Sequence, residues 1–379
     1  MQVVWSGESP PREYAASIFL AGPTPRSPEV ASWRPRALEL LAARGYSGVV
    51  FVPEHRERAT PYELDAQMAW EEDCLQRADA VVFWVPRAMQ TLPALTTNVE
   101  WGAWCRSGKA VLGTPPEAER VDYIRRQAAQ LGVPLADSLE ETLAAALALV
   151  GEGALRAGAE TEVPLFVWRT PGFQAWYRAQ RAAGNELLGA RVLWHLRKRG
   201  RTFLWALRPT VRVAAEDRVK DREVVIARPD ASAVLAYRRG ASLAEHELLL
   251  VSEFRSAVAN PAAQVLELPG GSSDDPELDP RAVAAEELWE EVGLRVAAER
   301  LRPVGARQLA ATLLGHRAHL YALELSAEEL AELRARAGRP THPDGCERTS
   351  PELLRVGDLL ADPRADWSAL GMVLAAITA

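Results

Sequence analysis

The sequence lacks the features that mark several classes of protein. Its three cysteines, Cys74, Cys105 and Cys346, lie far apart and form no CxxC motif, so they predict neither a disulfide framework nor a zinc knuckle. No run of about 20 apolar residues occurs, which predicts no membrane-spanning helix and no membrane partner. The start, MQVVWSGESPPREY, has no basic and then apolar signal pattern. Together these absences favour a cytoplasmic protein.

Basic residues are also in the minority. Lys and Arg number 44 against 51 Asp and Glu, which gives a formal net charge of −7. This balance argues against a nucleic-acid partner. The chain is 48% hydrophobic and 25% charged, an ordinary globular composition, and its 379 residues are enough for two domains with a core each.

The first half alternates short apolar runs with helical patterns. The predicted strands are 17–23, 48–53, 80–86 and 109–115. The predicted helices are 29–45, 62–79, 98–108, 119–132 and 137–150. Continuous apolar strands separated by helices predict an α/β domain of the Rossmann-like or flavodoxin-like kind, with a parallel sheet covered on both faces.

The second half follows a different pattern. Residues 151–162, GEGALRAGAETE, are small and polar and read as linker, so we predict domains at 1–152 and 185–379, joined by a linker and lead-in at 153–184. Segments such as HELLLVSEFRSAV alternate like strands of a mixed or antiparallel sheet. Long helices are predicted only at about 281–292, 326–337 and 366–378. This half is predicted to be α+β.

One acidic stretch of the second half needs an explanation. Leu268–Leu294 holds eight carboxylates and a single arginine. Pro280 suits the first turn of a helix that Gly293 ends. On that helix Glu287, Glu290 and Glu291 share one arc, where they repel each other unless a divalent cation joins them. Mg²⁺ (or Mn²⁺) prefers such oxygen ligands. A solvated acidic face is the alternative, but such a face usually carries Lys one turn on, and here none follows.

The acidic stretch resembles the Nudix box, G-x5-E-x7-R-E-U-x-E-E-x-G-U, in which U is apolar. The matching residues are Gly271, Glu277, Glu287, Leu288, Glu290, Glu291, Gly293 and Leu294. The spacing between the two halves of the box is one residue longer than in the family. The position of the family arginine, which braces the glutamates, holds Glu286, and this residue adds repulsion.

The flanking sequence resembles the ADP-ribose pyrophosphatase branch of the Nudix hydrolases. Phe254, Arg255, Glu267, Pro269 and Gly271 stand in the positions of its Tyr/Phe-Arg pair and its E-x-P-x-G turn. The end of the chain also resembles that branch, in which a late-loop glutamate assists catalysis, and both Glu347 and Glu352 are candidates.

The resemblance implies a Nudix fold over about 185–379 and metal-assisted hydrolysis of a nucleoside diphosphate linkage, such as that in ADP-ribose. The implied metal ligands are Glu267, Glu287, Glu290 and Glu291, of which Glu290 and Glu291 are also implied to be catalytic. Arg255 and Gly271 are implied to bind substrate. A structural or surface salt bridge is an equally good role for Arg255.

The first half has an acidic candidate of its own. The segment ALTTNVEWGAW places Glu100 near the start of a short helix, where the helix dipole would stabilise its anion. It follows the strand at 80–86, at the edge of a parallel sheet where ligands bind. An ordinary first-turn glutamate is the alternative. Trp84, Trp101 and Trp104 lie nearby and either stack a base or belong to the core.

The first half resembles the nucleoside 2-deoxyribosyltransferase family over about 15–150. Ile18–Pro23, Trp70-Glu71 and Thr96–Gly102 match its F-L-A-G-P, W-E and T-T-x-V-E-W-G motifs. The resemblance implies that Glu100 is a nucleophile that attacks the anomeric carbon of a nucleoside and releases the base.

Other residues of these motifs are implied to contact substrate. Either Glu71 or Asp73 would be a second acid. Gly22, Thr97, Asn98 and Trp101 are the remaining implied contacts. Ala94 stands where the family has an aspartate, and Thr97 and Asn98 could supply polar contacts in its place.

The two halves together predict a bifunctional nucleotide-processing enzyme that acts on a small-molecule substrate and forms a homo-oligomer. One half would act at an N-glycosidic bond, with NAD as one candidate substrate, and the other at a diphosphate. A nucleotide-binding sensor or scaffold with a degenerate Nudix site is the alternative, which Glu286, the lengthened box and Ala94 favour.

Overall fold

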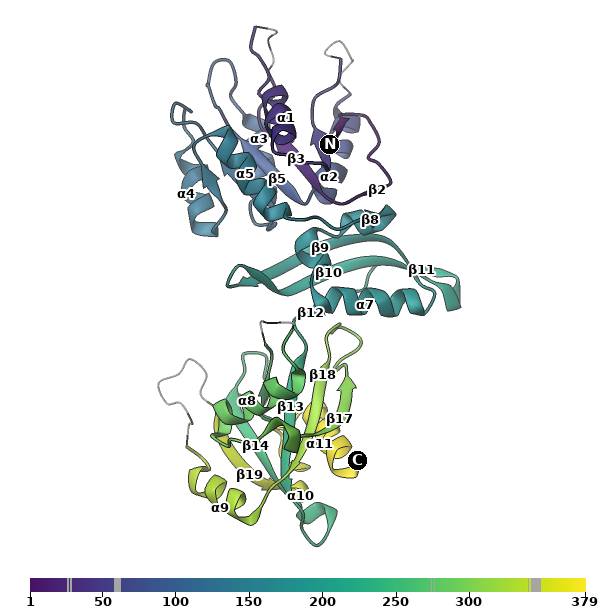
Figure 1. Cartoon of the computed structure of the whole chain (residues 1–379), viewed down its shortest axis with the longest axis vertical. Helices are drawn as coiled ribbons and strands as arrows, with labels where there is room; N and C mark the ends of the chain where they lie inside the picture. Colours follow the sequence, from purple (N-terminus) through teal and green to yellow (C-terminus); the bar gives the residue numbers. More distant parts are fainter. Residues whose placement is uncertain are drawn as a thin grey trace. The chain divides into compact units, whose positions relative to one another are not determined.

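The computed structural model describes residues 1–25, 27, 29–57, 63–273, 275, 277–339, 341 and 349–379. Within these ranges the chain divides into two compact units (Figure 1). The first comprises Met1–Thr170 and Tyr177–Val224, and the second comprises Pro171–Trp176 and Val225–Ala379. None of the described helices has the length and apolar character that crossing a membrane requires. The candidate Glu347 lies outside the described residues.

The first unit contains a six-stranded parallel sheet, as the apolar runs predict. Its strands are β1 (Gln2–Trp5), β3 (Ser17–Ala21), β4 (Val49–Val52), β5 (Ala80–Trp84), β6 (Ala110–Gly113) and β7 (Leu135–Ala136). Their order is β1-β4-β3-β5-β6-β7, and every neighbouring pair is parallel. A central strand such as β3, SIFLA, is buried along its whole length because helices cover both of its faces.

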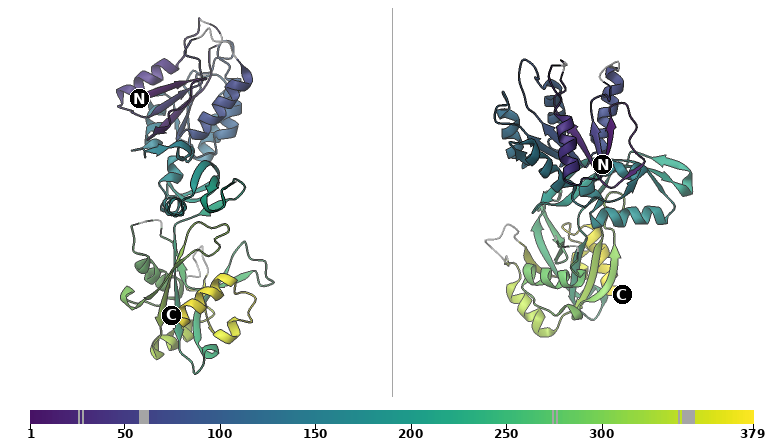
Figure 2. Two further views of the ribbon diagram at one scale, coloured as in Figure 1. Left: turned by 90° about the vertical axis from the view of Figure 1, so that its right-hand side faces the viewer. Right: turned by 45° about the horizontal axis from the view of Figure 1, so that its top comes forward.

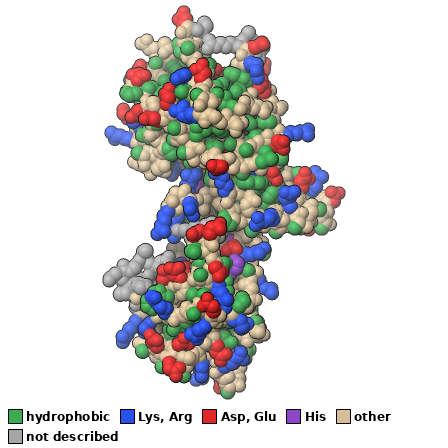
Figure 3. Space-filling view, viewed as in Figure 1, with side chains coloured by type: hydrophobic (Ala, Val, Ile, Leu, Met, Phe, Trp, Pro, Cys, Tyr) green, Lys and Arg blue, Asp and Glu red, His purple; other side chains and the backbone are tan. Residues whose placement is uncertain are grey.

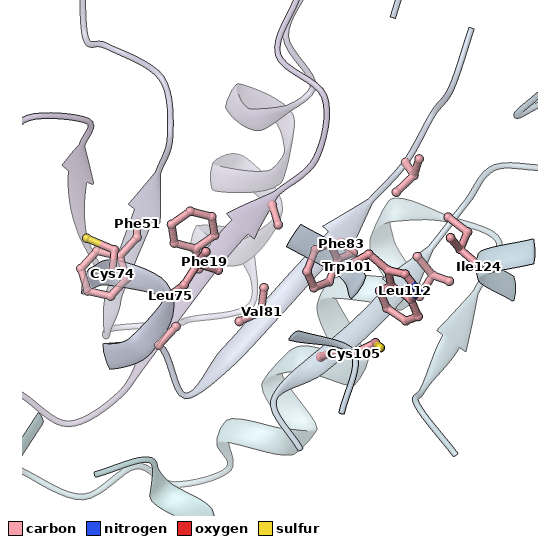
Figure 4. Close-up of a cluster of buried hydrophobic side chains, with 14 of the residues drawn as sticks. Phe19, Phe51, Cys74, Leu75, Val81, Phe83, Trp101, Cys105, Leu112 and Ile124 are labelled. Atoms are coloured by element: carbon pink, nitrogen blue, oxygen red, sulfur yellow. The ribbon is translucent and has the colours of Figure 1, made fainter. Parts of the chain in front are cut away.

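The helices of the first unit form two layers around the sheet. They are α1 (Arg34–Ala43), α2 (Leu64–Arg77), α3 (Leu95–Trp104), α4 (Asp122–Leu131) and α5 (Leu139–Val150). Phe19 and Phe83 pack with α2, α3 and α4 on one face, the cluster in Figure 4, while Ile18 and Leu20 pack with α1 and α5 on the other. Helix α1 begins later than the predicted residue 29 because Pro35 occupies its first turn.

The strand order creates a crevice at the carboxyl edge of the sheet. The chain leaves β3 toward β4 on one side, and β5 then pairs on the other side of β3. The loops after β3 and β5 therefore diverge, and such a switch point is where open α/β sheets bind ligands. Gly22 allows the loop after β3 to approach the end of β5 closely, because a Cβ at this position would lie 2.3 Å from the carbonyl oxygen of Trp84.

The predicted linker is in fact built into the first unit. Strand β8 (Arg156–Ala157) pairs with β2 (Glu13–Tyr14), and the 3-10 helix η1 (Gly158–Glu162) follows. The Arg156 side chain is fully buried and grips Asp79 with two hydrogen bonds of 2.9 and 2.6 Å. The prediction of a free linker was wrong here because its small and polar composition conceals this buried ion pair.

A long hairpin completes the first unit. Strands β9 (Glu186–Lys198) and β10 (Arg201–Val213) pair along their length, and β11 (Arg218–Lys220) pairs with β10. The amide nitrogen of Ala190 donates to Glu162 at 3.0 Å, and Gln76 donates to the carbonyl of Ala190. The hairpin thus belongs to the first unit, so the second unit does not begin at the predicted residue 185.

The second unit is built on a seven-stranded mixed sheet. Its strands are β13 (Ala231–Arg238), β14 (Glu247–Phe254), β15 (Gln264–Glu267), β16 (Gly270–Gly271), β17 (Arg302–Arg307), β18 (Ala318–Glu324) and β19 (Ser350–Arg355). Only β13 and β18 pair in parallel among these described strands, and the other pairs are antiparallel. Of the two kinds of sheet predicted for this half, mixed or antiparallel, the mixed one is present.

Helices cover both faces of this sheet (Figure 2). Helices α8 (Pro280–Val292) and α9 (Ala327–Arg336) pack on one face, and α10 (Val356–Leu359) and α11 (Trp367–Thr378) pack on the other. Helix α8 starts and stops as predicted, with Pro280 in its first turn and Gly293 at φ +71° after its last residue.

Candidate functional site

A cavity of about 730 Å³ lies at the switch point of the first unit. Loops that follow the carboxyl ends of β3, β4 and β5 line it, together with α1, α2 and α3. Of the predicted residues, Gly22, Glu71, Thr97 and Glu100 line this cavity. Unpredicted lining residues with polar side chains include Thr24, Arg34, Glu54 and Gln67. The sequence-predicted carboxylates therefore meet in one recess.

The Glu100 carboxyl has a pKa near neutral pH. It stands in the second turn of α3, because the helix begins at Leu95 and not at the predicted Asn98. The predicted stabilisation of its anion by the helix dipole is therefore wrong. Burial and then the charge of Glu71 raise the pKa of the Glu100 carboxyl, and Arg34 lowers it, with a net pKa of about 7.

Arg34 forms a rigid cationic wall of the cavity. Its guanidinium is fully buried and donates to the carbonyl oxygens of Leu20 at 3.0 Å and Gly22 at 2.7 Å. It also donates to Thr24 at 3.0 Å and to Glu54 at 2.5 Å. These bonds fix a positive charge beside the acidic pair. No sequence signal marks Arg34, because its partners come from two separate loops.

Glu71 is the last member of a hydrogen-bonded row of side chains that starts at Ser6, the residue after β1. Its carboxylate accepts from Gln67 at 2.6 Å, and Gln67 in turn accepts from the Ser6 hydroxyl. Burial raises the pKa of Glu71, while Gln67 and Arg34 lower it. His55, which follows β4, also lines the cavity and lies 3.3 Å from the Ser6 carbonyl oxygen through Nδ1.

Three predicted contacts do not reach the cavity. Asp73 faces outward and pairs with Arg77 at 2.8 Å, so Glu71 is the second acid of this recess. Asn98 accepts from Arg87. Trp101 is buried in the core, where it meets the ring of Phe83 edge-on. Helical spacing turns Asn98 about 100° away from Thr97 around α3. Trp101 lies one turn after Thr97, and its side chain packs into the core instead of lining the cavity.

Trp84 and Trp104, the other tryptophans near the site, also pack in or against the core. Trp84 is buried, and Trp104 packs partly against the core beneath the Lys109 ammonium, 4.7 Å from its ring centre. Ala94 does line the cavity, at φ +57°.

The second unit gathers carboxylates where α8 packs on β16. Glu291 accepts from the amide nitrogen of Gly270 at 2.9 Å. The Glu287 carboxylate lies against Gly271, where a Cβ would approach its oxygen to 2.2 Å. Gly271 thus makes room for a box glutamate. Burial, opposed by the hydrogen bond from Gly270 and supported by the charges of Glu287 and Glu253, raises the pKa of Glu291 to about 8.

Arg255 joins two further acids on the same face of the sheet. It contacts Glu253 at 2.8 Å and Glu267 at 3.0 Å. Glu253 is almost fully buried and was not predicted as a site residue, although an acid at the end of an apolar run, two residues before Arg255, is a usable signal. The structural salt bridge weighed for Arg255 is therefore present.

The remaining candidates of the second unit lie apart. Glu290 and Glu286 are exposed on α8. Glu352 lies opposite Leu250, whose side chain packs on the α11 face, and it pairs with Arg364 at 2.8 Å. It is therefore across the sheet from α8. Within the described ranges, no three His, Cys, Asp or Glu side chains lie close enough together to hold a metal ion.

Comparison with known proteins supports the first of the two resemblances. A family model described as "Nucleoside 2-deoxyribosyltransferase like" matches residues 15–118, the region that supplies the four central strands of the sheet and all the residues that line the cavity. The first unit therefore contains a domain similar to that family. The comparisons give no support to the resemblance predicted for the second half. No curated protein matches the chain.

Proposed function

We propose that the cavity of the first unit cleaves or transfers at the N-glycosidic bond of a nucleoside or nucleotide. The observation that carries this proposal is the pairing of Glu100 with Glu71 in a recess of the matched region. A carboxylate nucleophile with a second carboxyl group in the same recess is what a glycosidic reaction through a covalent intermediate needs.

The chemistry follows from the two environments. Ionised Glu100 attacks the anomeric carbon, an ester bond forms, and the bond to the base breaks with its electron pair leaving on the base. Glu71, whose pKa burial raises, donates the proton that the departing base takes up. Water or a second base then attacks the same carbon, the ester bond breaks with its electron pair returning to the Glu100 carboxylate, and Glu71 accepts the proton that the attacking group loses.

The test is release of free base from a panel of nucleosides and nucleotides, followed by mass spectrometry of the products. Glu100→Gln removes the nucleophile and is expected to reduce release at least about 1,000-fold, since such a residue acts on the reacting bond itself. Asp73→Asn is the matched control, because Asp73 sits on α2 beside Glu71 yet faces outward. Equal loss in both variants would contradict the assignment.

We propose hydrolysis of a diphosphate as the function of the second unit, a proposal independent of the first. The carboxylates around β16 favour it, since Glu253, Glu267, Glu287 and Glu291 are the oxygen donors that Mg²⁺ or Mn²⁺ prefers. Their described positions form no ready metal site. For a cation to bind there, Arg255 must first break its ion pair with Glu253 or with Glu267.

Titration calorimetry with Mn²⁺, beside AMP release from ADP-ribose, tests this second function. Glu291→Gln should abolish both, while Glu286→Gln, an exposed neighbour on α8, should leave both intact. Binding of ADP-ribose without hydrolysis would instead favour the sensor or scaffold.

A further inference from the structure

The hairpin of β9 and β10 carries dense positive charge in a chain that is negative as a whole. Between Leu187 and Ala215 the sequence has seven Lys and Arg and no Asp or Glu. Figure 3 shows blue side chains at the level where Figure 1 places these strands. The net charge of −7 hides this local excess, and the local field is what an anionic partner meets.

The register of the hairpin sets cations directly opposite one another. Arg201 lies opposite Lys198, and Arg208 lies opposite Arg191. Like charges in directly opposed positions destabilise a sheet. Arg191 approaches the nearby Glu72 only to 4.0 Å. A polyanion lying along the hairpin would turn the repulsion between Arg191 and Arg208 into favourable contacts with both.

An exposed apolar patch separates the two cation pairs. Trp194 lies opposite Ala206, and Leu196 opposite Leu204. Trp194 is 51% exposed and Leu196 46% exposed. Side chains alternate between the two faces of a strand. The register of the hairpin shifts by one residue at each of two bulges, between Thr202 and Leu204 and between Ala206 and Leu207. Once these shifts are counted, both cation pairs lie on the same face as Trp194. The other face is the inner one, where Trp205 is buried.

We propose that this face binds single-stranded nucleic acid. The residues of this surface, the hairpin platform, are Arg191, Trp194, Leu196, Lys198, Arg201 and Arg208. A base stacks on the exposed indole, and the cation pairs at the two ends contact phosphates several nucleotides apart on either side of it. Cations, the exposed indole and further cations thus follow one another along a single face of the hairpin.

The shape of the hairpin disfavours an anionic membrane as the partner. A hairpin that enters lipid needs its apolar residues at the end that enters. Here the turn is Arg199-Gly200, with φ +49° and +80°, and cations flank it on both strands. The apolar residues lie farther back along the strands.

Fluorescence anisotropy of a labelled oligodeoxythymidine of about 20 nucleotides with the full chain tests the proposal. Binding is expected at about 50 mM NaCl and should weaken steeply toward about 200 mM. The double variant Arg191→Gln/Arg208→Gln should lower the salt slope by roughly 1.4, since each single-strand phosphate contact contributes about 0.7. Trp194→Ala should weaken binding at least about fivefold and leave the slope unchanged.

Arg212→Gln is the matched control, because Arg212 lies opposite Glu186 at 3.6 Å, beyond the platform. It should bind the oligonucleotide much as the unaltered chain does. Arg208→Gln should not lower the Tm, since it relieves repulsion. The proposal is overturned if no binding occurs at low salt, if the platform variants bind as tightly as the control, or if the chain prefers phosphatidylserine vesicles to the oligonucleotide.

Discussion

Burial of Glu100 links the proposed reaction to pH. A nucleophilic carboxylate must be ionised, and its pKa of about 7 means that the ionised fraction grows as pH rises through neutrality. We expect kcat/KM for base release to climb as pH rises toward about 7, because the ionised fraction of Glu100 grows over that range. A profile that is flat from about pH 5 to 8 would show that Glu100 does not act as an anion.

The same shift predicts how stability depends on pH. The folded chain holds the Glu100 proton up to about pH 7, whereas the unfolded chain loses it near 4.5, so the free energy of unfolding falls as pH rises between these values. Glu100→Gln removes this loss and should stabilise the chain at pH 8 by at most about 3 kcal/mol. Urea denaturation at about pH 5 and 8 measures the difference, which should vanish at the lower pH.

At this scale the sequence predicts some site residues and misses others for clear reasons. Motif order identified Glu100 and Glu71, and the structure brings both to one cavity. Arg34 was missed because its role depends on carbonyl oxygens of a distant loop. Trp101 was misplaced because an aromatic side chain near a site is equally suited to the core.

At the scale of elements, Gly22 controls how closely β3 and β5 approach. A methyl group there would collide with the Trp84 carbonyl at 2.3 Å and with the Trp33 ring at 2.9 Å. Gly22→Ala should therefore cost about 3 kcal/mol of stability and distort the cavity. Gly102→Ala on α3 meets nothing within 4 Å and should be neutral or slightly stabilising. Equal Tm values for the two variants would contradict this account.

The sequence predicts the elements well where one pattern decides them. Apolar runs located the central strands, and Pro280 and Gly293 located α8. The hairpin of β9 and β10 was assigned to the wrong unit, since an alternating strand pattern does not reveal which body it packs against.

At the scale of the whole molecule, one buried ion pair ties the predicted linker to the first unit. Asp79 and Arg156 are both fully buried, and Asp79 also accepts from the amide nitrogens of Ser17 and Leu165. Arg156→Met would leave the Asp79 charge unpaired and should cost about 3–5 kcal/mol.

Truncation tests the same point. A fragment of residues 1–152 lacks Arg156, whereas 1–224 keeps it together with the hairpin. Only the longer fragment is expected to unfold cooperatively in thermal denaturation. A shorter fragment that melts as sharply as the longer one would show that the linker prediction was right after all.

The most direct measurement of the central claim is the mass of the chain during turnover. Acid quenching of the full chain with a nucleoside substrate, followed by digestion and mass spectrometry, should reveal one glycosyl group on the peptide that contains Glu100. The adduct should be absent from Glu100→Gln and present in Asp73→Asn. Base release by the unaltered chain with the adduct on another residue, or undiminished release by Glu100→Gln, would contradict the account.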